Sequence, residues 1–178
     1  GDPDWEKTKY FMLWGVAEDH ASNPIKMGLN RLKERGGKFV AVNPVRTGYQ
    51  AIADEWIPIK PGTDAMLALS LIHVLLKNEL FDWEFLVRYT NAHYLVVDTP
   101  RTKGDGLFIR NEEGIPQSWD LEKECLVNAT DPKIKPALLG NYKAPDGTPV
   151  KTAFTIMTER YMSDEYSPEN ASKVCGVP

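Results

Sequence analysis

Cysteine is scarce in this sequence, and no long apolar run occurs in it. The two cysteines among 178 residues are Cys125 and Cys175, which lie far apart and form no CxxC pair. This spacing indicates neither a zinc site nor an iron–sulfur site. No apolar run reaches the roughly 18–20 residues needed to span a bilayer, so we expect no direct membrane insertion.

Several nucleotide-binding and catalytic motifs are also missing. The loop at residues 15–24 reads GVAEDHASNP and lacks the GxGxxG fingerprint, which argues against an ordinary NAD enzyme. The sequence has no P-loop, no Ser–His–Asp spacing and no cluster of metal ligands. The net charge of −4 argues against a nucleic-acid partner.

The sequence does have the composition of a globular domain and a regular beginning. With 42% hydrophobic and 26% charged residues, the chain can bury a core of its own. Two apolar segments, Tyr10–Trp14 and Lys38–Val42, flank a helical pattern that begins at Pro24. Strand–helix–strand units of this kind form adjacent parallel strands with a right-handed crossover. We therefore predict an α/β fold with a mainly parallel sheet and helices on both of its faces.

Composition and periodicity predict further elements along the chain. They are a short helix at Thr47–Asp54, a strand at Trp56–Ile59, a buried helix at Asp64–Asn78 with Thr63 as its N-cap, an amphipathic helix at Phe81–Thr90, a β-prone piece at His93–Val97, and helices at Lys151–Met162 and Ser167–Val174. Residues 98–150 are rich in Pro, Gly and charge. This composition is typical of an irregular excursion, with Leu107–Arg110 and Lys123–Asn128 as candidate short strands.

The histidines and several aromatic residues indicate packing rather than chemistry. His73 interrupts an apolar helix, so a hydrogen-bonded core histidine is expected, and His93 should make a local contact. Four aromatic side chains are interpreted as packing residues: Tyr49, Trp56, Trp83 and Trp119.

Two polar loops leave the same hydrophobic core. The strand at Lys38–Val42 runs into Asn43–Thr47, and Lys60–Asp64 precedes the buried helix. A polar residue in the place of Asn43 normally meets a nucleotide ribose, and Arg46 can stack on a base or pair with a phosphate. Ligands of open α/β sheets bind beyond the carboxyl ends of the strands, so we predict that the two loops form one pocket.

The ordered combination of these pieces resembles one protein family. The pieces are Trp14-Gly15, then Asn43-Pro44-Val45-Arg46, then Ala53–Pro58, then Pro61-Gly62-Thr63-Asp64-Ala65-Met66-Leu67. Residues 9 to 97 resemble the α/β domain of the dimethyl sulfoxide reductase family of molybdopterin oxidoreductases that holds one of two molybdopterin guanine dinucleotides. The resemblance implies a Rossmann-like, three-layer αβα domain with a mainly parallel sheet.

The resemblance also implies which residues bind the dinucleotide. Its phosphates and pterin end would meet Gly15, Val16, Ala17 and His20. Its nucleoside would meet Asn43, Pro44, Arg46, Gly62, Thr63 and Asp64. The family's pattern makes Asp64 the guanine acceptor, and a carboxylate suits the N1–H and 2-amino donors that adenine lacks. Asn stands at position 43 where the family usually has Asp, and Val45 separates Pro44 from Arg46.

By the same resemblance, the parent protein is a molybdenum oxidoreductase and this chain is one fragment of its catalytic subunit. The parent would carry Mo-bis-MGD and a [4Fe–4S] cluster, whose ligands lie upstream of this segment in the family. No catalytic or metal-binding residue is therefore expected here, and the fragment alone should be inactive. Expected partners are the remaining domains of the same polypeptide, a membrane anchor subunit, and an iron–sulfur electron-transfer subunit. The compartment stays open between bacterial cytoplasm and periplasm, of which we favour the cytoplasm.

Within the family, two stretches point toward sulfite dehydrogenase-like subunits. They are Asn43–Tyr49 and Val87–Ala92. We expect residues 1–178 to form a single domain, with a dinucleotide-binding core at 9–97, an irregular insertion at 98–150 and a helical return segment at 151–178. Two alternatives stay open: a stand-alone nucleotide-binding or regulatory domain, and a small NAD enzyme, which the missing GxGxxG disfavours.

Overall fold

The computed structural model describes residues 4–16, 24–46 and 48–178. It divides the chain into two compact units, of which unit 1 comprises Gly1–Leu71 and Pro168–Pro178, and unit 2 comprises Ile72–Ser167. The contacts thus group residues 72–97 with the segment that follows them. The expected dinucleotide-binding core at 9–97 stays a prediction about function.

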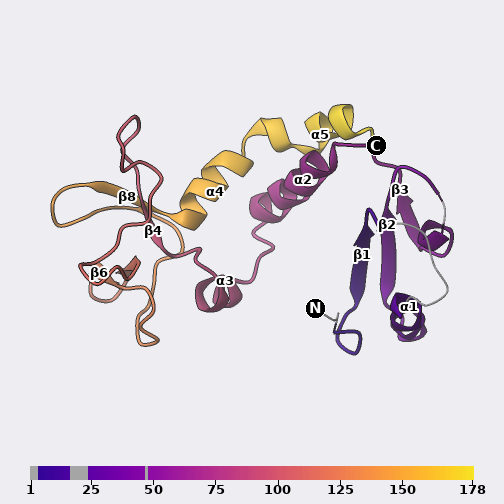
Figure 1. The fold of residues 1–178 in the computed structure, drawn as a ribbon, viewed down its shortest axis with the longest axis horizontal. Helices are drawn as coiled ribbons and strands as arrows, with labels where there is room; N and C mark the ends of the chain where they lie inside the picture. The colour runs from indigo at the N-terminus through magenta and orange to yellow at the C-terminus, as the bar shows by residue number, and fades with distance from the viewer. Residues whose placement is uncertain (1–3, 17–23, 47) are drawn as a thin grey trace. The chain divides into compact units, whose positions relative to one another are not determined.

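Unit 1 contains a parallel sheet of three strands (Figure 1). Strands β1 (Tyr10–Trp14), β2 (Lys38–Val42) and β3 (Glu55–Ile57) lie in the order β1-β2-β3. The register pairs Trp14 with Val42 and Val42 with Ile57. This confirms the prediction that the first two segments are adjacent parallel strands. All three strands end at the same edge of the sheet.

Alternating side chains of these strands enter two separate cores. Helix α1 (Ile25–Glu34) buries Leu29 and Leu32 against Phe39 and Ala41, and the 3₁₀ helix η1 (Gly48–Ala51) adds Tyr49 to this core. The second core joins Val42 to Ile59, to Leu67 of helix α2 (Asp64–Lys77) and to Cys175 of helix α5 (Pro168–Cys175). Apolar contacts are therefore available to both sets of strand side chains, as expected for a buried parallel sheet.

The core of unit 2 lies among its helices. Leu76 of α2 packs with Leu138 and with Phe154 of helix α4 (Ala153–Tyr161), and helix α3 (Trp83–Tyr89) adds Leu86 and Val87. His73 is buried, and its Nδ1 lies 2.9 Å from the carbonyl oxygen of Tyr161. This confirms the expected core histidine.

Unit 2 also contains two small antiparallel sheets within and beside residues 98–150. One has the order β4-β8-β7, formed by β4 (Leu95–Val97), β8 (Pro149–Thr152) and β7 (Asn141–Lys143). The other pairs β5 (Gln117–Asp120) with β6 (Cys125–Asn128). Pro116 and Pro136 lie at isolated bridges beside these strands, positions at which a missing N–H is tolerated. The candidate strand at Lys123–Asn128 is confirmed by β6, whereas the candidate at Leu107–Arg110 forms only isolated bridges, at Phe108 and Arg110.

The predicted helix at Lys151–Met162 begins two residues late. Thr152 is the last residue of β8 and the N-cap of α4, and its hydroxyl accepts from the Thr155 N–H at 3.1 Å. A short 3₁₀ helix, η2 (Asp164–Tyr166), precedes α5. Among the described residues, none of the helices has the length and apolar character to cross a membrane.

Candidate functional site

The carboxyl edge of the unit 1 sheet brings together most of the predicted site residues. The hydrogen-bond ladder extends one residue beyond the strands, because Gly15 N donates to Val42 O at 3.0 Å and Asn43 N donates to Ile57 O at 3.1 Å. Gly15 has φ of +64°, a conformation that residues with a side chain rarely adopt. The chain therefore turns sharply off the sheet where a ligand can approach the backbone.

Asn43 ties the loops that follow β1 and β2. Its side-chain Nδ2 donates to Val16 O at 3.4 Å, and its Oδ1 accepts from Val45 N at 3.3 Å. The second bond is an Asx turn, which shapes the loop locally. Asn43 thus organises the predicted binding loop and retains hydrogen-bonding capacity for a ligand.

Trp56 of β3 supports the same loop from the next strand. Its indole Nε1 donates to Asn43 O at 2.9 Å, and the guanidinium carbon of Arg46 lies 5.8 Å from the centroid of its ring. Arg46 and Pro44 are exposed. Trp56 was expected only to pack, so its cation–π contact with Arg46 is a feature that sequence reasoning missed.

Asp64 lies beside the same edge of the sheet, at the start of α2 and next to the end of β1. Gly62 has φ of +80°, and the Thr63 hydroxyl donates back to Lys60 O at 2.7 Å, so its hydrogen is directed away from the helix. Asp64 is the first residue of α2 and is exposed. Its Oδ1 accepts from the indole Nε1 of Trp14 at 2.7 Å, a bond that links the end of β1 to the start of α2.

The structure therefore gathers eight of the ten predicted residues at one edge: Gly15, Val16, Asn43, Pro44, Arg46, Gly62, Thr63 and Asp64. Ala17 and His20 lie outside the described residues. Chemically, the edge offers a carboxylate, a guanidinium and sharply turned backbone. In the described part of the chain, no group of three or more His, Cys, Asp or Glu side chains could hold a metal ion.

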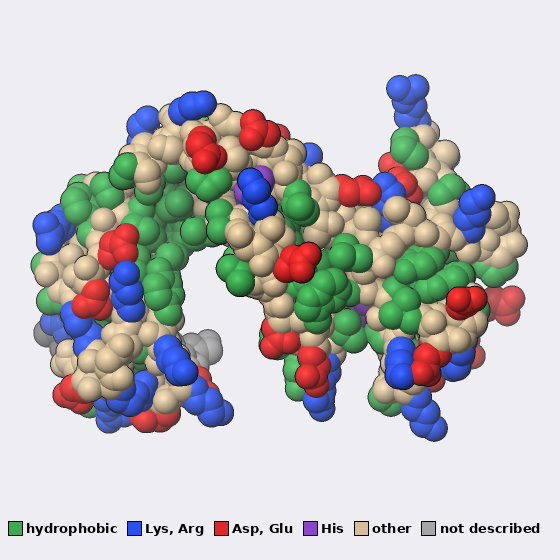
Figure 2. Space-filling view, turned by 180° about the vertical axis from the view of Figure 1, so that it is seen from behind, with side chains coloured by type: hydrophobic (Ala, Val, Ile, Leu, Met, Phe, Trp, Pro, Cys, Tyr) green, Lys and Arg blue, Asp and Glu red, His purple; other side chains and the backbone are tan. Residues whose placement is uncertain are grey.

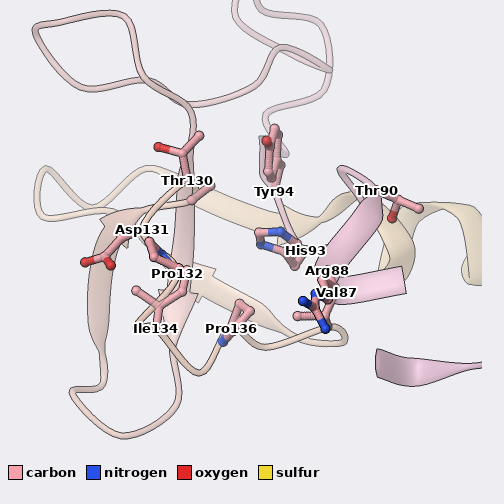
Figure 3. A pocket seen from close by; sticks show the side chains of 11 residues that line it. Val87, Arg88, Thr90, His93, Tyr94, Thr130, Asp131, Pro132, Ile134 and Pro136 are labelled. Atoms are coloured by element: carbon pink, nitrogen blue, oxygen red, sulfur yellow. The ribbon is translucent and has the colours of Figure 1, made fainter. Parts of the chain in front are cut away.

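Unit 2 contains a separate hollow of about 470 Å³ (Figure 3). His93 lies between the Thr130–Pro136 loop and the end of α3 in this view. Its Nδ1 is 2.6 Å from the Ser118 hydroxyl, and burial lowers the pKa of the imidazole. Burial thus favours the uncharged form of His93, and the Ser118 hydroxyl is the local contact that was expected.

Comparisons with known proteins agree on one family. A model of the molybdopterin oxidoreductase family matches residues 2–161. The chain is 48% identical to a sulfite dehydrogenase subunit from Allochromatium vinosum over 187 residues, covering 100% of this chain and 19% of that protein. It is 30% identical to the alpha subunit of perchlorate reductase from Dechloromonas aromatica, covering 98% of this chain and 23% of that protein.

A solved structure supports the same fold. Acetylene hydratase from Pelobacter acetylenicus superposes with a TM-score of 0.53 at 19% identity, over 98% of this chain and 15% of that chain. The chain spans about a fifth of the length of the curated relatives named above, 19% and 23%. The family match, the two relatives and the shared fold show that this chain belongs to the molybdopterin oxidoreductase family, as a segment related to the catalytic subunits of large molybdenum enzymes.

Proposed function

We propose that the carboxyl edge of the unit 1 sheet binds the guanine nucleotide end of one molybdopterin guanine dinucleotide. The observation that carries the proposal is the placement of Asp64 beside the ends of three parallel strands, joined to β1 through Trp14. This is the edge at which open α/β sheets receive ligands. We infer that unit 1 is the Rossmann-like, three-layer part of the parent protein.

The residues at this edge fit such a group. An exposed carboxylate at the start of α2 can accept two hydrogen bonds from guanine, and the turned backbone at Gly62 leaves open space in place of a side chain. Asn43 and Arg46 would hold the ribose and the phosphates or base. Gly15 and Val16 would face the phosphates, together with Ala17 and His20 by resemblance to the family.

The parent protein is proposed to be a molybdenum oxidoreductase related to sulfite dehydrogenase. When bound, the molybdenum cofactor would supply the redox chemistry, and this segment would anchor one of its nucleotides. For the parent we also propose a [4Fe–4S] cluster, a membrane anchor and an iron–sulfur subunit, with the cytoplasm favoured as its compartment. The relative from Allochromatium vinosum is named as one subunit of its enzyme, which implies further subunits there.

The test compares cofactor content in the full-length catalytic subunit. Asp64→Ala should lower the guanosine monophosphate released by acid hydrolysis per polypeptide, because guanine's two donors lose their acceptor. The matched control is Asp82→Ala, since Asp82 is the N-cap of α3 and accepts from Phe85 N at 2.9 Å. Equal nucleotide content in the two equally stable variants would show that Asp64 is only a helix-terminal residue.

A further inference from the structure

Trp14 combines an anchored ring with an outward-facing donor. It is the last residue of β1, is partly buried and packs against the core that contains Val42, Ile59 and Leu67. A tryptophan side chain has one polar atom, the indole N–H, which can only donate. The packed ring fixes the direction of that N–H, and it is aimed at Asp64 Oδ1 at 2.7 Å.

Asp64 would otherwise be poorly restrained. It is exposed, and in the described part of the chain no Lys or Arg forms an ion pair with its carboxylate. A charge-assisted bond to a fixed donor restricts its rotation before any ligand arrives. A carboxylate has acceptor capacity for about four hydrogen bonds, so one bond to Trp14 leaves room for two donors of a ligand.

We propose that Trp14 is a positioning residue, which orients the Asp64 carboxylate for the paired donors of guanine. This inference rests on the proposed function of the same edge. Preorganisation of this kind raises affinity because the ordering cost is met in the free protein. The competing interpretation is that the Trp14–Asp64 bond only joins β1 to α2 and stabilises unit 1.

The experiment uses the full-length catalytic subunit with Trp14→Phe, which keeps an aromatic ring and removes the N–H. Guanosine monophosphate released by acid hydrolysis is measured per polypeptide, and thermal stability is measured on protein made without the cofactor. We expect Trp14→Phe to at least halve the nucleotide content at unchanged stability of the cofactor-free protein. Trp119→Phe is the matched control, because Trp119 lies in unit 2 and stacks on Tyr142 with ring centroids 4.5 Å apart.

A double-variant cycle separates positioning from packing. If Trp14 acts through Asp64, Trp14→Phe should cause no further loss in an Asp64→Ala background, since the effects of coupled residues are not additive. Should Trp14→Phe fold poorly, 3-benzothienylalanine at position 14 replaces the N–H with sulfur and keeps the bicyclic ring.

The outcomes are distinct. Wild-type nucleotide content in the Trp14 variants, with loss in Asp64→Ala, would overturn the positioning role and leave the proposed function standing. An equal loss on removing the N–H with Asp or Ala at position 64 would also overturn the positioning role. Wild-type content in Asp64→Ala would instead overturn the proposed function itself.

Discussion

At the scale of single residues, Asp54 is a carboxylate that joins two elements of unit 1. Its Oδ2 accepts from Phe39 N at 2.8 Å, and its Oδ1 lies 3.0 Å from the Lys33 ammonium. The hydrogen bond from Phe39 N, followed by the one from Lys33, lowers the pKa of Asp54 below its ordinary value of 3.8. Asp54 thus joins the beginning of β2 to the end of α1.

Asp54→Asn should destabilise unit 1 by about 1 kcal/mol near neutral pH, mainly through the weakened bond to Phe39 N, since solvent screens the Lys33 pair. Because the folded-state pKa is depressed, the stabilisation is present above the unfolded pKa and is lost as pH falls through the folded value. Urea unfolding between about pH 6 and about pH 3 should show the two proteins converging in acid.

The control for this prediction is Glu55→Gln. Glu55 pairs with Lys38 at 3.1 Å, and the two side chains are 53% and 54% exposed. An exposed pair of this kind contributes little, so this variant should match the wild type at each pH. A difference between wild type and Asp54→Asn that grows toward acid would contradict the assigned sign.

The positions of single site residues were predictable from the sequence, but their hydrogen-bond partners were not. The pattern of strand, turn and helix start predicted that Asn43 and Asp64 would reach one edge, and they do. Their partners were not predictable, because Trp14 and Trp56 look like strand residues and their indole N–H bonds depend on where neighbouring segments lie. Only Trp14, the last residue of β1, carries a signal in its position, because a tryptophan at the carboxyl end of a parallel strand lies beside the edge where ligands bind.

At the scale of elements, Gly28 sits in the interior of α1. Glycine there costs helix stability, and its replacement by Ala normally gains about 1 kcal/mol. In this protein a Cβ at position 28 would overlap the indole ring of Trp5, which packs on Phe11 with ring centroids 4.9 Å apart. The glycine is therefore required by a close approach.

Gly28→Ala should lower the stability of unit 1 by about 1–3 kcal/mol, because the overlap exceeds the gain in helix propensity. Asn30→Ala, an exposed position of the same helix, should be neutral or slightly stabilising. Chemical denaturation of the three proteins checks both expectations. A stabilised Gly28→Ala protein would mean that Trp5 moves aside at little cost.

The elements of the two units were predictable to different degrees. In unit 1, doubly apolar segments and a helix of suitable length predicted the β1–α1–β2 order. In unit 2, β4 pairs with β8 across Leu95 and Thr152, and nothing local in residues 98–150 specifies that partner. Short antiparallel strands with exposed faces carry a weak pattern, so the segment looked irregular.

At the scale of the molecule, this chain and its relatives differ greatly in length. It covers 19% of the sulfite dehydrogenase relative. Large hydrophobic side chains reach the surface of both units on the face drawn in Figure 2. By exposed fraction and irrespective of the face, the exposed large hydrophobic residues include Met27 and Val45 of unit 1 and Trp83, Phe85 and Tyr89 of unit 2.

We expect the 178-residue chain produced alone to carry no stoichiometric molybdenum and to show no oxidoreductase turnover. By the family resemblance, we expect the metal ligand and the cysteines of the proposed cluster to lie in other segments of the parent protein. Metal analysis of the purified chain, beside the full-length protein from the same host, checks the expectation. Stoichiometric molybdenum in the short chain would refute it.

Helix α5 completes the core of unit 1 that contains Val42, Ile59 and Leu67, and this affects how the chain folds during synthesis on the ribosome. Lys60 N donates to Cys175 O at 2.9 Å, and Cys175 is buried with Val42, Ile59 and Leu67. These partners emerge early, whereas Cys175 emerges only after all of unit 2 has been translated. Closing a loop that contains all of unit 2 carries an entropic cost. Until that loop closes, the uncovered apolar surface of unit 1 is prone to aggregation. We therefore expect the apolar surface of Val42, Ile59 and Leu67 to stay exposed until the segment that contains Cys175 has left the ribosome.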